Sequence, residues 1–453
     1  MATFTTTQLD CIHPLGDRAI RPVGQERPEQ IESLHSKLQL RLNTVARVLP
    51  ALRRTLDVIP SPETHRPGLL LRDPLRYTDR VLFIPPPWAA GLRCLDGEHT
   101  ELDIQEALTR ATGTLIFSDA VREFVGVLQE QGFLETEEFY RLRKQKQAEF
   151  QEWSERLPVH AGQAYPAGAL ELRSTFEGYF EAVTRSDGPS SRVLGVAAPH
   201  VSPEGGRNCY AATYRTLAAS PALAERTFVV LGTSHYGAPE KFGLTRKPFV
   251  TPLGTLQVDT ELVEWLEQHG GEAISREDYC HAIEHSIEFQ CVFLRYALGS
   301  ELKIVPILCG PFAESLQTGR PPETNATVAR FFDALKELAQ AQSDRLFWVL
   351  GIDLAHVGPR YGDAFAAVAE RGTMAGVAEQ DRQRLESLCD GHVSKFFELV
   401  KLNEDELRWC GYSPLYTFAQ AVPRARGRVL RYEQWNIDPQ SVVSFASVEF
   451  FVP

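Results

Sequence analysis

Five apolar runs in the C-terminal two thirds of the sequence alternate with helical segments, and this alternation constrains the fold more than any other feature. The runs are VLGVAAPH, TFVVLGTSH, LKIVPILCG, LFWVLGIDLAH and VVSFASVEFFV, and the segments between them include TELVEWLEQH, ATVARFFDALKELAQAQ and HVSKFFELVKL. Strands that are apolar throughout are buried on both faces, so helices must cover both sides of the sheet. The pattern predicts an α/β domain over residues 168–453.

A smaller module precedes this domain. The segments RPGLLLRDP and RVLFIPPP read as two short strands. A helix is expected after them, with Thr100 as its N-cap and with Ile104 and Leu108 on its buried face. A strand pair followed by helices is typical of a small winged-helix-like α+β domain.

A second helix is expected in the segment SDAVREFVGVLQEQGFLE. Ser118 or Asp119 is the predicted cap, and Gly132 the predicted end. Its apolar stripe consists of Val121, Phe124, Val125 and Leu128. This helix carries more acidic than basic residues, which argues against a DNA-reading winged helix.

The whole chain is therefore expected to have four parts. Residues 1–50 form an N-terminal extension that is partly disordered, with helical spacing over residues 31–58. Residues 51–140 form the winged-helix-like domain, and residues 141–167 a helical linker that ends in a Gly/Pro breaker. Residues 168–453 form the α/β domain.

Composition excludes several classes of protein. The net charge of −12 argues against a dedicated nucleic-acid binder. We expect no membrane association, because no apolar run is long enough to span a bilayer and no signal segment begins the chain. None of the eight cysteines forms a C-x-x-C pair, so a zinc ribbon is not expected. A soluble, cytoplasmic protein is the resulting expectation.

Polar residues that can bind metals follow three of the apolar runs. His200 ends the first, His235 the second, and the fourth contains Asp353 and ends in His356. One such histidine would most often be a hydrogen-bonded core or loop residue. Ligands of open α/β sheets, however, bind at the carboxyl ends of the strands, and imidazole is a common metal ligand. The repeated pattern therefore favours a metal or catalytic site.

A second cluster, Glu284-His285-Ser286-Ile287-Glu288, opens a predicted helix. One interpretation makes His285 an acid/base or substrate-orienting residue. The other is a capped helix start with a solvated acidic face, and the spacing alone favours this second interpretation. For Cys410, beside Trp409, the sequence alone likewise favours a buried and inert thiol.

Six motifs occur together in an order and spacing that resemble the Memo family. They are APH (198–200), LGTSH (231–235), EHSIE (284–288), IVPILCG (304–310), IDLAH (352–356) and CGYSP (410–414). The resemblance covers about residues 190–453, and the AmmeMemoRadiSam system protein B group is the most similar. Six ordered motifs are far more specific than any one of them.

The resemblance implies a fold similar to the class III extradiol dioxygenases, with a sheet flanked by helices. It implies that His200, His235 and Cys410 hold a mononuclear transition metal, iron or copper, with zinc as an alternative. It also implies that His356 is the catalytic acid/base with Asp353 near it, and that His285 lines the pocket.

The sequence departs from the family pattern around this ligand set. Val201-Ser202 replaces a glycine-tyrosine pair, Tyr236 a second histidine, Gln290 a histidine, and Val357-Gly358 an aromatic residue. The ligands are retained but the pocket differs, so the family's substrates do not transfer.

The front module is similar to PqqD-like domains through its "LDG…T…I" entry and "L…GFL" exit. A generic helical interaction module is an equal alternative. Domains of the PqqD-like type hold a peptide or a partner enzyme. The resemblance to the AmmeMemoRadiSam system implies radical-SAM and AMMECR-type proteins of the same system as partners, which fits this front module, and a peptide is a possible ligand of the module itself.

Three functions remain open from the sequence. The first is a metal-dependent redox enzyme, and the second a non-catalytic scaffold that binds a peptide or a metal. The third is a zinc hydrolase, which is weaker because no motif supplies a glutamate as general base, although Asp353 could serve.

Overall fold

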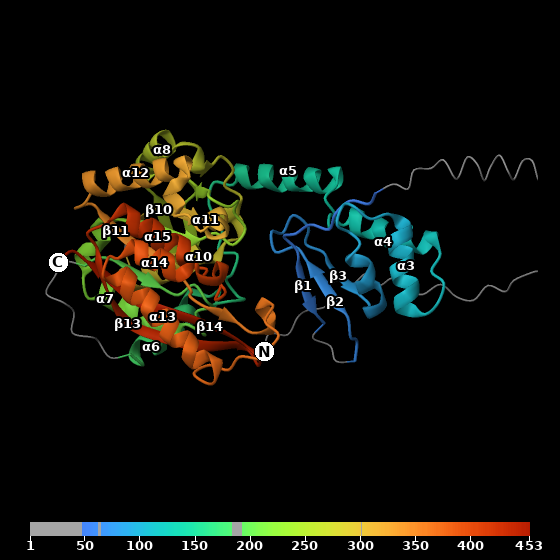
Figure 1. Ribbon diagram of the computed structural model, residues 1–453. Helices are drawn as coiled ribbons and strands as arrows, with labels where there is room; N and C mark the ends of the chain where they lie inside the picture. The colour runs from blue at the N-terminus through green and yellow to red at the C-terminus, as the bar shows by residue number, and fades with distance from the viewer. Residues whose placement is uncertain (1–47, 62–64, 184–192, 300) are drawn as a thin grey trace, which may run out of the picture. The chain divides into compact units, whose positions relative to one another are not determined.

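A computed structural model describes residues 48–61, 65–183, 193–299 and 301–453 (Figure 1). The chain divides into two compact units, Met1–Ala148 and Glu149–Pro453, and the division falls inside helix α5 (Glu137–Glu152). Residues 1–47 of the N-terminal extension expected over residues 1–50 lie outside the described residues. Of the helix expected over residues 31–58, the described part, from residue 48, is not helical.

Unit 1 contains a three-stranded antiparallel sheet in the order β1-β2-β3, followed by helices. Its elements are β1 (Asp57–Pro60), β2 (Leu69–Arg72), β3 (Val81–Ile84), α2 (Ala89–Leu92), α3 (Glu101–Thr112) and α4 (Ser118–Glu130). The two strands predicted from the sequence are β2 and β3; β1 was not predicted. The PqqD-like identity of this unit stays a prediction.

Local sequence signals explain both long helices of unit 1. Thr100 caps α3 in a reciprocal capping box with Asp103, and Ile104 and Leu108 are buried as predicted. The predicted stripe of α4 is also buried, but its predicted cap is wrong. Ser118 is already helical and Phe117 occupies the cap position, without a side-chain hydrogen bond.

Unit 2 is built on a large mixed sheet. Its path is β12-β14-β4-β11-β5-β10-β6-β9. Beside this path, β13 pairs with β14, β8 pairs with β10, and β7 pairs with β8. The strands are β4 (Val193–Ala198), β5 (Thr227–Thr233), β6 (Phe242–Leu244), β7 (Phe249–Thr251), β8 (Gly254–Val258), β9 (Ile274–Ser275), β10 (Lys303–Cys309), β11 (Leu346–Gly351), β12 (His356–Val357), β13 (Arg426–Asp438) and β14 (Ser441–Phe451). The central strands β4, β11, β5 and β10 are parallel, whereas β14 and β6 run antiparallel to them.

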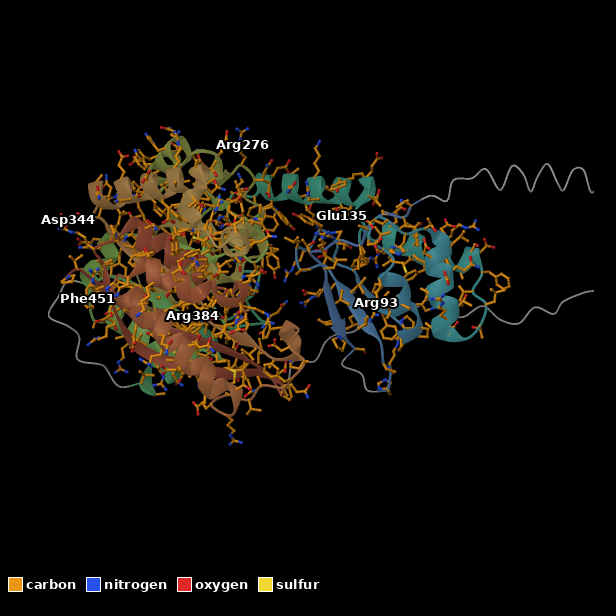
Figure 2. All side chains as sticks on the ribbon, viewed as in Figure 1. Arg93, Glu135, Arg276, Asp344, Arg384 and Phe451 are labelled. Atoms are coloured by element: carbon orange, nitrogen blue, oxygen red, sulfur yellow. The ribbon has the colours of Figure 1, made fainter. Side chains whose placement is uncertain are left out.

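Helices flank this sheet, as the alternating sequence pattern predicts (Figure 1). They are α6 (Ala169–Glu181), α7 (Arg207–Ala218), α8 (Thr260–His269), α9 (Cys280–Ile283), α10 (His285–Leu298), α11 (Ala313–Thr318), α12 (Ala326–Ala341), α13 (Thr373–Cys389), α14 (Val393–Val400) and α15 (Tyr412–Ala421). Helices α7 and α10 pack on one face, with α6 outside α7. Helix α15 packs on the other face, beneath α12 and α14. Side chains fill the space between these layers (Figure 2).

The first turn of α10 lies unusually close to the central strands. A Cβ atom on Gly232 would be 2.5 Å from the Ser286 hydroxyl, and one on Gly351 would be 2.3 Å from the Ser286 carbonyl oxygen. Strands β5 and β11 therefore need glycine at these two positions, since a side chain there would push the helix away. The N-terminus of α10 is thus fixed at the carboxyl ends of the parallel strands.

A buried ion pair joins α10 to the segment that precedes α6. The Glu288 carboxylate, 1% exposed, bonds the guanidinium of Arg156, the phenol of Tyr165 and the Nδ1 atom of His160. Burial alone would raise the pKa of Glu288, but the Arg156 guanidinium outweighs it and holds this pKa below its usual range, at about 2. The carboxylate is therefore charged across the neutral range and its partners are satisfied.

No helix in the described part of the chain is long and apolar enough to cross a membrane.

Replacing Glu288 by glutamine should lower the free energy of unfolding of unit 2 by about 3 kcal/mol, because Arg156 keeps its charge in the interior without its carboxylate. Chemical denaturation of the full-length chain measures this. The matched control is Glu386→Gln, whose side chain is 56% exposed and pairs with Arg382 on the surface of α13. The control should cost less than about 1 kcal/mol. Equal losses in the two variants would contradict the prediction.

Candidate metal and catalytic site

Three adjacent parallel strands deliver polar residues to one edge of the sheet. His200 follows β4 by two residues, Asp353 follows β11 by two, and His235 follows β5 by two. Gly351 pairs with Ala198 on one side and with Gly232 on the other, so these strand ends lie nearly level. The strand-end pattern in the sequence therefore corresponds to a real cluster in space.

His200 is 2% exposed and is held from two directions. Its Nδ1 atom lies 3.0 Å from the Gly351 carbonyl oxygen, and its backbone N–H donates to the Asp353 carboxylate at 3.0 Å. A carbonyl oxygen can only accept, so Nδ1 carries the proton. The Nε2 atom is left with a free lone pair.

One buried carboxylate orients the next two histidines. Glu284 is 2% exposed and caps α10, accepting from the backbone N–H groups of His285 and Ser286. It also lies 3.0 Å from Nδ1 of His235 and 3.2 Å from Nδ1 of His285. Both imidazoles therefore direct Nε2 away from the carboxylate, as in the carboxylate–histidine pairs that support metal ligands.

The three imidazoles converge. One nitrogen from each of His200, His235 and His285 lies within 4.8 Å of the other two, and the His235 and His285 rings stack at 4.7 Å between centroids. Side chains of His235 and His285 are about one quarter exposed, so the cluster is open to solvent on one side. The EHSIE motif therefore contributes a residue to the cluster, and its two glutamates are buried rather than on a solvated acidic face as the spacing alone suggested.

Cys410 approaches the cluster from the opposite face of the sheet. Its Sγ atom is 3.3 Å from Nε2 of His200 and 3.7 Å from the Asp353 carbonyl oxygen. The Thr233 hydroxyl bonds the Cys410 carbonyl, and the Gly411 N–H bonds the Asp353 carbonyl. The thiol thus lies two residues before α15, next to the nitrogen that His200 leaves free.

Asp353 and His356 form the remaining side of the site. The Asp353 carboxylate is 3% exposed and reaches within 3.5 Å of Nε2 of His200. Nδ1 of His356 donates to the carbonyl oxygens of Leu354 and Arg408, at 2.9 and 3.1 Å. The Nε2 atom of His356 is therefore the acceptor end of its ring.

Electrostatics favour neutral imidazoles at most of these positions. Burial, with the neighbouring His235 and His285, lowers the pKa of His200 well below its ordinary value, and burial lowers the pKa of His356 to about 4. At His235 burial acts in the same direction, but Glu284 outweighs it and raises the pKa. Burial and Asp353 raise the pKa of the Cys410 thiol well above its usual value. Without a cation nearby, the thiol keeps its proton.

Sequence reasoning missed His160. Its Nδ1 bonds Glu288 at 2.8 Å, and its ring lies 5.7 Å from the ring of His285. It falls in a segment predicted to be a linker, away from the strand ends on which the prediction of the site was based.

Gln290 departs from the family pattern, and its amide donates to the Pro199 carbonyl beside His200. The substituted residue therefore supports the backbone of a candidate ligand.

The loop that leads to Cys410 holds an uncommon backbone. Asn403, Glu404, Asp405 and Arg408 all have φ between 50° and 58°, a left-handed conformation that non-glycine residues rarely adopt. Asp405 accepts from the Trp409 N–H at 2.7 Å, while its second oxygen has no hydrogen-bond partner among the described residues. Burial raises the pKa of Asp405 to about 6.

Replacing Asp405 by asparagine should stabilise the protein at pH 7 but not at pH 4. The folded-state pKa lies above the ordinary value of 3.8, so the wild-type chain loses stability as the pH rises from about 4 to about 6. The variant should escape a loss on the order of 2 kcal/mol, and asparagine tolerates the left-handed backbone. Denaturation curves across this range test the expectation. Asp333→Asn, at an exposed carboxylate on α12, is the control, and parallel pH profiles for Asp405→Asn and wild type would refute it.

Comparison with known proteins agrees with the motifs. A family model described as Memo-like protein matches residues 156–449. A MEMO1 family protein of Aquifex aeolicus is 26% identical over 385 residues, covering 84% of this chain and 94% of the relative. A MEMO1 family protein of Methanosarcina acetivorans is 33% identical over 299 residues, covering 65% of this chain and 98% of the relative.

These relatives differ in how much of the chain they match. The Aquifex alignment is longer than unit 2, so it extends into unit 1, whereas the Methanosarcina protein is matched almost entirely over a length close to that of unit 2. A crystal structure of an uncharacterized protein from Escherichia coli K12 matches 57% of this chain and 99% of its own at 11% identity, with a TM-score of 0.31, too distant to bear on the fold. The family model covers well over half of the sequence, and the chain therefore belongs to the Memo-like protein family.

Proposed function

We propose that this protein is a metal-dependent redox protein that holds one transition-metal ion, iron or copper, with His200, His235 and Cys410 as ligands. The observation that supports this most strongly is the convergence of donors at His200. One nitrogen each of His200, His235 and His285 lies within 4.8 Å of the other two, and the Cys410 sulfur lies 3.3 Å from Nε2 of His200. Histidine and cysteine donors gathered at one place are what a single transition-metal ion requires.

The chemistry of the donors fits such an ion. Each histidine has its Nδ1 atom bonded to a carbonyl or carboxylate oxygen, which fixes the tautomer that ligation requires. The Cys410 thiol must release its proton on binding, and a cation that replaces the proton stabilises the thiolate. Two imidazoles and one thiolate suit copper or thiolate-tolerant iron better than they suit magnesium or calcium.

His285 competes with Cys410 for the third position on geometric grounds, because its nitrogen belongs to the same cluster. We assign it to the pocket wall, as a residue that contacts or orients substrate. Its ring is stacked on His235 and is about one quarter exposed, so it faces the open side of the cluster. The thiol lies on the α15 side of the sheet, next to Nε2 of His200.

The acid/base role falls to His356 in this proposal. Its Nδ1 atom is held by two carbonyl oxygens, so proton exchange with a bound molecule takes place at Nε2. Burial keeps this ring neutral at physiological pH, ready to accept a proton. Asp353 orients the backbone of His200 and places negative charge beside His356, which favours the protonated ring once it has formed. The bound ion would supply the redox chemistry.

Unit 1 is where we propose that a partner binds. It is a separate compact unit, and its outer strand β1 exposes Val58 and Ile59 at 45% and 37%. Exposed apolar residues on a terminal strand are a common feature of surfaces that receive another chain. Partnership with radical-SAM and AMMECR-type proteins remains a prediction from the resemblance.

Metal analysis of anaerobically purified full-length protein tests the proposal. Wild-type protein should carry about one iron or copper ion per chain. His200→Ala and Cys410→Ser should each weaken binding at least about 100-fold, more than most changes outside the ligand shell. His285→Ala should retain the ion. His269→Ala and Cys94→Ser, which lie outside the site, are the matched controls.

Three outcomes would count against it. Wild-type protein without a stoichiometric transition metal would overturn the metal site. Loss of the ion in His285→Ala, with retention in Cys410→Ser, would exchange the roles of these two residues. Zinc as the only ion bound would remove the redox function and favour a hydrolase.

A further inference from the structure

We propose that Asp381, on α13, is a positioning residue of the metal site that sets the geometry of Cys410 and His356 through Trp409 and Ser444. The inference rests on the proposed metal-binding function. Asp381 touches none of the candidate ligands, and no sequence motif pointed to it. It emerges from a buried hydrogen-bond network behind the site.

The carboxylate of Asp381 is fully buried and accepts three hydrogen bonds from distant parts of the chain. Trp409 Nε1–H donates at 2.6 Å, the Ser444 hydroxyl at 2.6 Å and the Tyr432 hydroxyl at 2.8 Å. Arg384 lies one turn further along α13 (Figure 2), and its guanidinium sits 5.5 Å from the centre of the Trp409 ring. Asp381 therefore joins α13, β13, β14 and the loop before α15 at one point.

The neighbouring bonds indicate the direction of each bond to Asp381. Ser444 Oγ accepts from the Ala355 N–H at 2.9 Å, so its own proton is free to point at Asp381. Tyr432 OH likewise accepts from the Gln434 amide at 2.9 Å and donates onward. An indole N–H can only donate. All three hydrogen bonds therefore run toward Asp381, and its carboxylate accepts each of them.

Two of the three donors, Trp409 and Ser444, connect Asp381 to the candidate site. Trp409 directly precedes Cys410. Ser444 binds the loop between Asp353 and His356 three times, because its backbone N–H donates to the Ala355 carbonyl, its carbonyl accepts from the Leu354 N–H, and its hydroxyl accepts from the Ala355 N–H. One carboxylate thus fixes the two segments that carry Cys410 on one side and Asp353 and His356 on the other.

The energetics point to a positioning role rather than to general stability. A buried carboxylate that is satisfied mainly by neutral donors costs desolvation energy, and apolar packing at such a position is often at least as stable. What a carboxylate provides is a fixed geometry for its donors. That geometry matters here because the two segments it joins must face one another within the reach of a single ion.

A leucine at this position would remove both acceptor oxygens while keeping a side chain of similar size. The Ser444 and Tyr432 hydroxyls can turn their protons elsewhere, but the Trp409 N–H can only donate and would be left buried without an acceptor. We therefore expect the Trp409 ring to move. Movement of Trp409 shifts the backbone that carries the Cys410 sulfur.

The test uses cobalt(II) as a probe on the full-length apoprotein. The near-ultraviolet charge-transfer band between sulfur and cobalt reports the Cys410 bond, and competition with a chelator gives the affinity. We expect Asp381→Leu and Trp409→Phe to bind cobalt about 10-fold more weakly, with a diminished band. Tyr432→Phe removes a donor to the same carboxylate without touching the loops of the site. It should lower the melting temperature yet keep the wild-type band and affinity.

The outcomes distinguish the positioning role of Asp381 from the proposed metal site on which it rests. If wild-type protein shows no sulfur band, or keeps it in Cys410→Ser, the metal assignment itself fails. If wild-type protein shows the band and both Asp381→Leu and Trp409→Phe retain it at full affinity, Asp381 is a structural residue and the inference is overturned. Should Asp381→Leu fail to fold, Trp409→Phe decides alone, since it leaves the bonds to Ser444 and Tyr432 in place. Asp390→Asn, exposed at the end of the same helix, controls for the loss of a charge.

Discussion

The geometry of the whole candidate site depends on the buried carboxylate of Glu284. It ends the preceding turn, caps α10 and orients the rings of His235 and His285 with the same two oxygens. These two histidines hold its pKa well below the ordinary value although burial alone would raise it. A helix N-terminus and two imidazoles therefore share one negative charge. Any change at this carboxylate alters the backbone of α10 and both rings together.

The fold explains why such distant residues meet. Parallel strands place successive carboxyl ends along one edge of the sheet, and β4, β11 and β5 are immediate neighbours there. Helices α10 and α15 then approach this edge from opposite faces. Two adjacent residues of β5 face these two helices. Gly232 lies against Ser286 at the start of α10, and the Thr233 hydroxyl bonds the Cys410 carbonyl just before α15. The antiparallel strand β14 adds Ser444, which anchors the loop that carries His356.

Much of this arrangement could be predicted from the sequence, because it follows from local patterns. Apolar runs ending in His200 and His235 predicted both the strands and the histidines that meet at their ends, and the EHSIE motif marked the start of α10. What escaped prediction depends on tertiary context. Glu288 and Asp381 look like ordinary surface acids of helices, and the interior partners that stabilise them, Arg156 and Trp409, lie far away in the chain. The left-handed backbone at Asp405 carries no glycine to mark it.

The two-sided approach of α10 and α15 has a consequence for when the cluster forms during folding. His200 and His235 follow strands β4 and β5, and His235 is oriented by Glu284 at the start of α10, whereas Cys410 precedes α15 on the other face of the sheet. A partly folded chain in which α15 has not packed on the sheet lacks the Cys410 donor and cannot chelate an ion tightly. Ligand capture would thus come at the last stage of assembly, and an ion held between the layers would act as a latch on the finished domain.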